Sequence, residues 1–112
     1  MKIYHNPRCS KSRQTLHLLQ EKGVQLEIVE YLKDLPSKTE LKEVLTKLGL
    51  QPEQIIRKGE TDFKENYKGK SLTDDEWIDA MVKYPKLIER PIVVNGNKAA
   101  LGRPPENVLE LI

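Results

Sequence analysis

Cys9 is the one cysteine in a sequence of 112 residues, and its surroundings indicate a reactive thiol. It follows a short β-prone segment, residues 2–5, and an Asn-Pro turn signal, and a helical pattern starts at Ser10. A thiol at this junction faces unpaired backbone N–H groups and the positive end of the helix dipole, and both favour the thiolate. Further positive charge is close in sequence, on Arg8, Lys11 and Arg13. We therefore predict that the pKa of Cys9 lies below the value of about 8.5 for a free cysteine, which makes the sulfur a nucleophile.

The spacing Cys9-Ser10-Lys11-Ser12 is Cys-x-x-Ser. A Cys-x-x-Cys pair resolves its own mixed disulfides, and a serine at the second position removes that internal thiol. The lone cysteine also excludes an internal disulfide, so the sequence is not a disulfide-stapled secreted scaffold, and it lacks the paired spacing of a zinc site. We therefore expect no metal, no bound cofactor and a reducing, cytoplasmic location. An external thiol, glutathione, is expected to complete any reaction that oxidises Cys9.

Length and charge narrow the remaining classes of protein. The chain is long enough for one hydrophobic core, which predicts a single domain over residues 1–112. The net charge of +2 is too even to indicate a nucleic-acid partner from bulk charge. No apolar run approaches the roughly 18–20 residues that span a bilayer, so neither a signal peptide nor a membrane anchor is expected.

The order of predicted elements favours an α/β architecture. Strands at residues 2–5 and 26–29 flank a helix that begins at Ser10 and stops at Gly23, a βαβ unit whose right-handed crossover makes the strands parallel. Capping boxes at residues 37–40 and 73–76 open two further helices. A short helix is predicted from Pro52 to about residue 57, and residues 60–70 are a polar stretch.

The end of the chain is predicted to return to strands. Residues 91–94 and 98–101 flank Asn95-Gly96-Asn97, and Asn-Gly is a strong hairpin signal. A last helix is expected from Arg103 onward. The order predicts a thioredoxin-like fold, with a small mixed four-stranded sheet and a helical insertion at about residues 36–85 between its βαβ and ββα halves.

Three segments resemble the signature segments of the glutaredoxin-linked arsenate reductase family. Residues 4–13, Tyr-His-Asn-Pro-Arg-Cys-Ser-Lys-Ser-Arg, resemble its active-site segment. Residues 89–94, Glu-Arg-Pro-Ile-Val-Val, and residues 102–106, Gly-Arg-Pro-Pro-Glu, resemble its other two. The resemblance covers essentially the whole chain and is greatest to the short bacterial members, many of which carry the reductase name without a demonstrated role in arsenical resistance.

The resemblance implies a set of site residues. Family members hold the oxyanion with three arginines, and the matching positions are Arg57, Arg90 and Arg103. Guanidinium groups suit tetrahedral oxyanions because their planar forks donate paired hydrogen bonds. Pro91 matches the cis-proline beside the active cysteine of such folds. His5 matches the family's active-site histidine. As an imidazolium it would lower the pKa of Cys9, and as a neutral ring it would order the loop.

Ser12 has two readings: its hydroxyl donates to the thiolate, or it favours the start of the helix. The implied reaction has the Cys9 thiolate attack arginine-bound arsenate. Glutathione then attacks the adduct, the arsenic(V) species collapses to arsenic(III) with oxidised sulfur, and glutaredoxin removes the glutathione as arsenite leaves. The expected partners are therefore arsenate or a similar oxyanion, glutathione and glutaredoxin.

Four other classes of protein are alternatives to this interpretation. Low-molecular-weight tyrosine phosphatases and thioredoxin-linked arsenate reductases need a Cys-x5-Arg loop, whereas the sixth residue after Cys9 is Thr15. Redox-sensing regulators that bind RNA polymerase use a Cys-x-x-Cys switch, which Ser12 interrupts. A glutathione-dependent thiol oxidoreductase that acts on another oxyanion or on mixed disulfides stays open as the alternative function.

Overall fold

A computed structural model describes all of the chain, residues 1–112. The chain divides into two compact units, one formed by residues 1–34 and 90–112 and the other by residues 35–89. The predicted helical insertion at residues 36–85 lies within the second unit. The structure contains no helix with the length and apolar character needed to cross a membrane.

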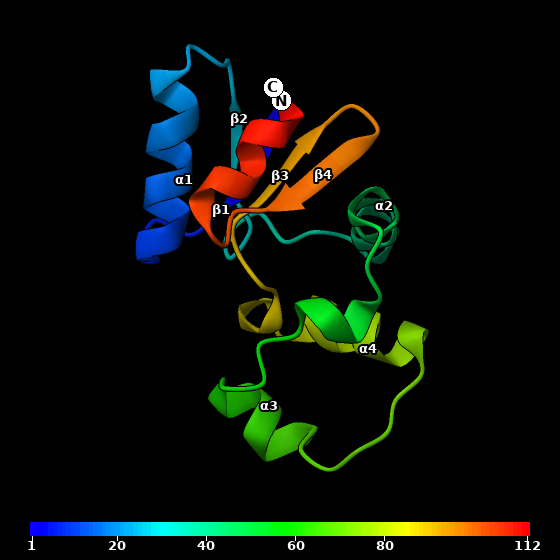
Figure 1. Ribbon diagram of the computed structural model, residues 1–112. Helices are drawn as coiled ribbons and strands as arrows, with labels where there is room; N and C mark the ends of the chain where they lie inside the picture. The colour runs from blue at the N-terminus through cyan, green and yellow to red at the C-terminus, as the bar shows by residue number, and fades with distance from the viewer. The chain divides into compact units, whose positions relative to one another are not determined.

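The first unit is built on a four-stranded mixed sheet (Figure 1). Its strands are β1 (Lys2–His5), β2 (Glu27–Glu30), β3 (Ile92–Asn95) and β4 (Lys98–Leu101), in the order β2-β1-β3-β4. The strand β1 is parallel to β2 and antiparallel to β3, and β3 is antiparallel to β4. The mixed α/β fold with parallel first and second strands is therefore confirmed.

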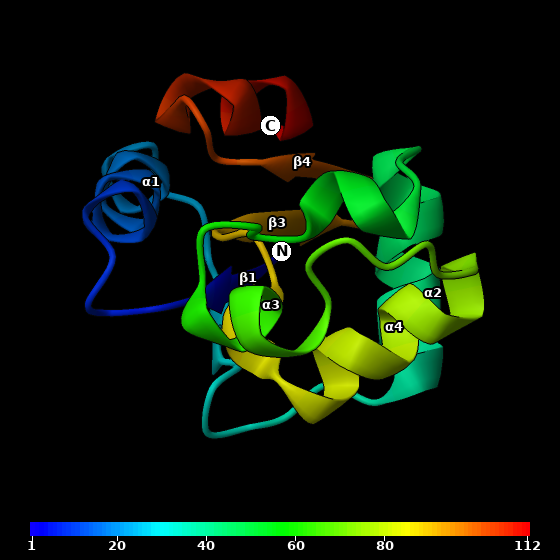
Figure 2. The same ribbon diagram turned by 90° about the horizontal axis from the view of Figure 1, so that it is seen from below.

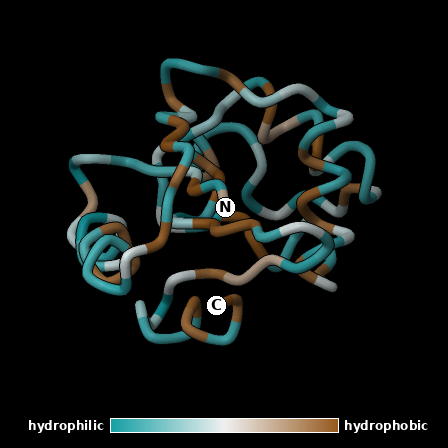
Figure 3. Tube along the Cα trace, turned by 90° about the horizontal axis from the view of Figure 1, so that it is seen from above, coloured by the Kyte–Doolittle hydropathy of each residue, from teal (hydrophilic) through white to brown (hydrophobic).

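Two helical segments share one apolar core with this sheet. They are α1 (Ser10–Glu21) and the C-terminal 3-10 helix η3 (Pro105–Leu111). Ile3 and Val93 are register partners on neighbouring strands, so both side chains point to the same face of the sheet. In Figure 3 the last helical segment, near the label C, is brown on part of each turn and teal on the rest, as expected for a helix with one buried side. The buried members of this core are Ile3, Leu19, Val93, Val108 and Leu111.

The predicted hairpin between β3 and β4 is present, but its loop is one residue shorter than predicted. Asn95 pairs with Lys98, so the loop consists of Gly96 and Asn97 rather than of Asn95, Gly96 and Asn97. Gly96 has a φ of 61°, and no residue other than glycine has a positive φ. A glycine with positive φ at the first central position suits a type II′ turn, whereas the type I′ turn associated with Asn-Gly needs positive φ at both positions.

The second unit is helical. Its elements are α2 (Lys38–Leu48), the 3-10 helix η1 (Pro52–Ile55), α3 (Thr61–Asn66), α4 (Asp74–Lys83) and the 3-10 helix η2 (Pro85–Leu87). The Thr73 hydroxyl accepts the Glu76 N–H, and the Glu76 carboxylate accepts the Thr73 N–H, which confirms that capping box. In Figure 2, α4 lies beside α2, against which it packs.

The helix α3 falls in the polar stretch where no helix was predicted. It has six residues, too few to show a 3.6-residue pattern, and Phe63 is its buried side chain. The ring of Phe63 stacks on Trp77 of α4, with centroids 6.1 Å apart and an angle of 14° between the planes. Tertiary packing of one aromatic side chain therefore fixes this helix, rather than a local sequence signal.

The segment after β4 approaches α1 closely at Gly102. The Gly102 N–H donates to the Pro91 carbonyl at 2.9 Å. The hydroxyl of the buried Thr15 lies 3.3 Å from the Gly102 carbonyl and 2.8 Å from the Lys11 carbonyl, to which it donates. A Cβ at Gly102 would lie 2.5 Å from Thr15 Oγ1 and 2.7 Å from Pro91 Cγ. A glycine is therefore required at position 102, directly before Arg103.

We predict that Gly102→Ala destabilises the protein by about 1–3 kcal/mol, because the added methyl group overpacks a buried contact. The measurement is the free energy of unfolding in urea. Gly59→Ala is the matched control, since a Cβ at Gly59 meets nothing within 4 Å and φ there is not positive. Equal losses of stability in the two variants would contradict the close packing at Gly102.

Candidate active site

Cys9 lies at the junction between β1 and α1, as the sequence predicted. It is the N-cap of α1, with φ −97° and ψ 123°, and its carbonyl accepts the Arg13 N–H at 3.0 Å. Its own N–H donates to the Asn6 carbonyl at 3.0 Å, which closes the loop that leads out of β1. The residue is 8% exposed, so it is largely removed from water.

Two of the three predicted arginines are next to the sulfur. Arg103 Nη2 lies 3.4 Å from Cys9 Sγ. Burial by itself raises the pKa of the thiol, but hydrogen bonds from the Ser12 N–H and from Arg90 outweigh it, together with the charges of Arg90 and Arg103. The net result is a lowered pKa for Cys9. The arrangement therefore favours a thiolate within reach of two guanidinium groups.

Backbone contacts hold these two arginines in place. Arg103 Nε donates to the Arg90 carbonyl at 2.8 Å, and Asn107 Nδ2 donates to the Arg103 carbonyl at 3.0 Å. The peptide bond Arg90–Pro91 is cis, as the resemblance implied, and Arg103–Pro104 is also cis, which was not predicted. The two arginines thus come from separate segments of the chain, and the hydrogen bond from Arg103 Nε to the Arg90 carbonyl links these segments directly.

His5 and Ser12 form a buried pair behind the loop. His5 Nδ1 lies 2.6 Å from Ser12 Oγ, and Ser12 Oγ accepts the Asn6 N–H at 3.0 Å. Burial lowers the pKa of His5, the Glu30 carboxylate opposes this, and Arg13 lowers the pKa further. A neutral ring is therefore favoured, and Nδ1 and the Ser12 hydroxyl share one hydrogen bond whose direction depends on the tautomer of the ring. Of the two roles considered for His5, the geometry supports ordering of the loop.

The hydroxyl of Ser12 is directed to His5 and Asn6, and the hydrogen bond to the thiolate comes instead from the Ser12 backbone N–H. The sequence predicts a turn at Asn6-Pro7 and indicates no other role for Asn6. In the structure its carbonyl accepts the Cys9 N–H, and its Oδ1 accepts the Arg8 N–H at 3.0 Å. An Asn side chain that bonds the backbone two residues ahead is a recognised turn signal, so this role could have been found from the sequence.

Arg57, the third predicted arginine, belongs to the second unit. Its backbone N–H donates to the Leu87 carbonyl at 2.7 Å, beside the single β-bridge between Ile56 and Ile88. Its guanidinium lies 3.5 Å from a Glu60 carboxylate oxygen and 3.9 Å from one of Glu89. The role of Arg57 in binding an oxyanion stays a prediction.

Comparisons with known proteins point to one family. A model of the ArsC family matches residues 4–111. The chain is 46% identical to an arsenate reductase of Haemophilus influenzae, covering 98% of this chain and 97% of that protein. It is 50% identical to the uncharacterised Escherichia coli protein YfgD, covering 100% and 96%. The solved structure of an arsenate reductase from Vibrio cholerae is 48% identical, with a TM-score of 0.95, covering 100% of this chain and 98% of that one.

We predict that the pKa of Cys9 is below its usual value and that Arg103→Gln raises it, because the variant removes a positive charge 3.4 Å from the sulfur. Thiolate absorbance at 240 nm, followed across pH, measures both values. Lys98→Gln is the matched control, since it removes one exposed positive charge at the hairpin end of β4. An unchanged pKa in Arg103→Gln would contradict the assignment.

We predict that His5 makes the protein less stable in acid. Its folded pKa is lowered by burial from 6.5, so below about pH 6.5 the unfolded chain binds a proton that the folded chain excludes. The free energy of unfolding should therefore fall more steeply between pH 7 and pH 5 in the wild type than in His5→Gln, by less than about 1.4 kcal/mol per pH unit, the limit for one proton. Urea unfolding at each pH gives the difference. If the free energy of unfolding of the wild type minus that of His5→Gln stayed constant or grew from pH 7 to pH 5, this result would count against a neutral His5.

Proposed function

This chain belongs to the ArsC family, and we propose on that premise that it is an oxidoreductase that reduces arsenate, with Cys9 as its nucleophile. The observation that carries this proposal is the 3.4 Å contact between Cys9 Sγ and Arg103 Nη2. A cation at that distance serves two purposes: it favours the thiolate, and it offsets the repulsion between that thiolate and an anionic substrate.

Arg90 and Arg103 are the proposed oxyanion ligands. Arsenate is a tetrahedral anion, and guanidinium groups bind such anions through paired N–H donors. Arg90 also lowers the pKa of Cys9 through a hydrogen bond and its charge, so both side chains already face the reacting atom. Binding the anion there places arsenic beside the sulfur, which converts the attack into a step between neighbours.

The proposed reaction uses two thiols. The Cys9 thiolate forms a bond to arsenic(V), and one arsenate oxygen leaves as hydroxide or water. Glutathione attacks this adduct, and arsenic gains two electrons as the two sulfur atoms lose one each and join in a mixed disulfide. Arsenic(III) departs as arsenite. Glutaredoxin then takes the glutathionyl sulfur, which returns Cys9 to the thiolate.

An external thiol is required because the chain has no second cysteine to resolve the mixed disulfide. Ser12 stands where a resolving thiol would be in Cys-x-x-Cys, and its hydroxyl is occupied by His5 and Asn6. Glutathione is the proposed thiol because it is the abundant one in a reducing compartment. No cofactor has to be bound for these steps.

We predict that the purified protein reduces arsenate with glutathione and glutaredoxin and that Cys9→Ser falls to the background rate, because serine is a far weaker nucleophile at neutral pH. Arsenite formation, coupled to oxidation of glutathione, measures the rate. Ser10→Ala is the matched control, since Ser10 is the exposed neighbour in the same turn. Circular dichroism of each variant checks its fold.

Two outcomes separate this proposal from the alternative function. Arsenite formation that Cys9→Ser abolishes supports arsenate reduction. A wild-type rate no higher than that of Cys9→Ser, together with Cys9-dependent reduction of a glutathione mixed disulfide, would overturn it in favour of a thiol oxidoreductase.

A further inference from the structure

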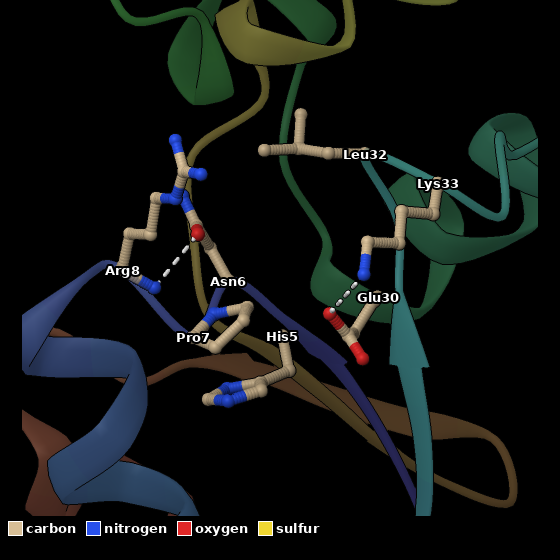
Figure 4. Close-up of a pocket in the computed structure, with 7 residues that line it drawn as sticks. All are labelled: His5, Asn6, Pro7, Arg8, Glu30, Leu32 and Lys33. Atoms are coloured by element: carbon tan, nitrogen blue, oxygen red, sulfur yellow. Dashed lines mark hydrogen bonds and ion pairs between the residues drawn. The ribbon is translucent and has the colours of Figure 1, made fainter.

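A cavity of about 260 Å³ lies where β1 and β2 end, within the first unit. One wall is the segment His5–Arg8, and the other is formed by Glu30, Leu32 and Lys33 (Figure 4). The strands β1 and β2 are parallel, and His5 pairs with Glu30, so both walls start from the same edge of the sheet. Arg8 directly precedes Cys9, and consecutive Cα atoms are about 3.8 Å apart, so the cavity adjoins the nucleophile's own backbone.

The charged groups of the cavity favour an anion. Arg8 and Lys33 stand on opposite sides of it in Figure 4, and Glu30 is the one carboxylate in its lining. Two cations against one carboxylate leave a net positive charge, since the lowered pKa of His5 keeps that ring neutral. Lys33 Nζ lies 3.8 Å from Glu30 Oε1, and the Lys33 side chain is 83% exposed. An exposed pair of this kind is worth little, so Lys33 can turn to a ligand at low cost.

The size and the other lining residues narrow the ligand. Sites for drug-sized molecules enclose about 300–1,000 Å³, so this cavity suits one end of a small peptide rather than a whole cofactor. Pro7 and Leu32 supply apolar surface between the two cations. A carboxylate on a short aliphatic stem matches both features. Asn6 Oδ1 accepts the Arg8 N–H at 3.0 Å, which fixes the backbone of Arg8 directly before Cys9.

We propose that this cavity binds a terminal carboxylate of glutathione and so directs its sulfur to Cys9. The inference rests on the proposed function in taking glutathione as the external thiol. Glutathione carries a carboxylate at each end, with its cysteine between them. Whichever end occupies the cavity, the glutathione sulfur then lies beside the cavity. Arg8 and Lys33 are not among the groups that lower the pKa of Cys9. Their role is therefore separable from activation of the thiol.

The test uses a reaction that needs no arsenate. The Cys9 thiolate attacks one sulfur of oxidised glutathione, forms the Cys9–glutathione mixed disulfide and releases one glutathione thiolate. Intact-mass analysis gives the rate with oxidised glutathione and with hydroxyethyl disulfide, a neutral disulfide. The variants are Arg8→Gln and Lys33→Gln, and Lys22→Gln removes one exposed lysine at the far end of α1 as the control.

Arg8→Gln and Lys33→Gln should each slow the reaction with oxidised glutathione about fivefold, equivalent to about 1 kcal/mol. The rate with hydroxyethyl disulfide and both rates of Lys22→Gln should stay within about twofold of the wild type. Glu30→Gln should speed the reaction with oxidised glutathione, because it removes the opposing charge. Added salt should narrow the differences, because these side chains are exposed.

Equal slowing with the neutral disulfide, no slowing at all, or slower reaction in Glu30→Gln would each overturn the assignment of the cavity. The disulfide of γ-glutamylcysteine lacks the glycine end of glutathione, and that of cysteinylglycine lacks the γ-glutamyl end. The end that occupies the cavity is the one whose removal abolishes the slowing of the reaction by Arg8→Gln. Absence of arsenate reduction with this selectivity intact would overturn only the proposed function. Loss of the selectivity with arsenate reduction intact would overturn only the cavity assignment.

Discussion

The contact between the Cys9 sulfur and the Arg103 guanidinium is the interaction on which the rest of the site depends. It joins residues 94 positions apart. Burial of the sulfur alone would favour the neutral thiol, and the charges of Arg90 and Arg103, with the Ser12 N–H, reverse that preference. A long arginine side chain loses much rotamer freedom when it is fixed, so the scaffold must hold it at several points. The Arg90 carbonyl holds its Nε, and Asn107 and Gly102 fix the backbone on either side.

The order of the strands explains why these distant residues meet. The strand β1 ends just before the Cys9 loop, and β3, antiparallel to it, begins just after Arg90, with Tyr4 opposite Ile92. The strand β4 runs back along β3 and ends opposite Ile92, just before Arg103. The end of β1, the start of β3 and the end of β4 therefore lie at one edge of the sheet. The parallel strand β2 ends at the same edge, which places Glu30 beside His5.

Local signals were sufficient for much of this arrangement. The Asn-Pro turn, the helix start after Cys9, the capping box at Thr73 and the βαβ order could all be predicted because each depends on neighbours in the sequence. The helix α3 could not, since the packing of Phe63 on Trp77 fixes it. The direction of the Ser12 hydroxyl could not be predicted from the sequence either, because it depends on the contact between His5 and the first turn of α1. The family resemblance named Arg90 and Arg103, whereas the requirement for glycine at 102 follows from the approach of Thr15.

In the proposed reaction two anionic reactants, the oxyanion and the external thiol, must both reach the sulfur of the single cysteine. The positive charges around Cys9 therefore have to attract both. With a single set of cations, the oxyanion and the thiol would compete for the same positive charges. The structure instead carries two sets on different pairs of strands. Arg90 lies just before the start of β3, Arg103 lies just after the end of β4, and both face the sulfur, whereas Arg8 and Lys33 follow β1 and β2 and line the cavity. In the proposed reaction the oxyanion and the thiol then have separate positive sites, and Cys9 lies in the segment that both adjoin. The external thiol can therefore approach the sulfur while the oxyanion is still held, as a resolving cysteine in the same chain would.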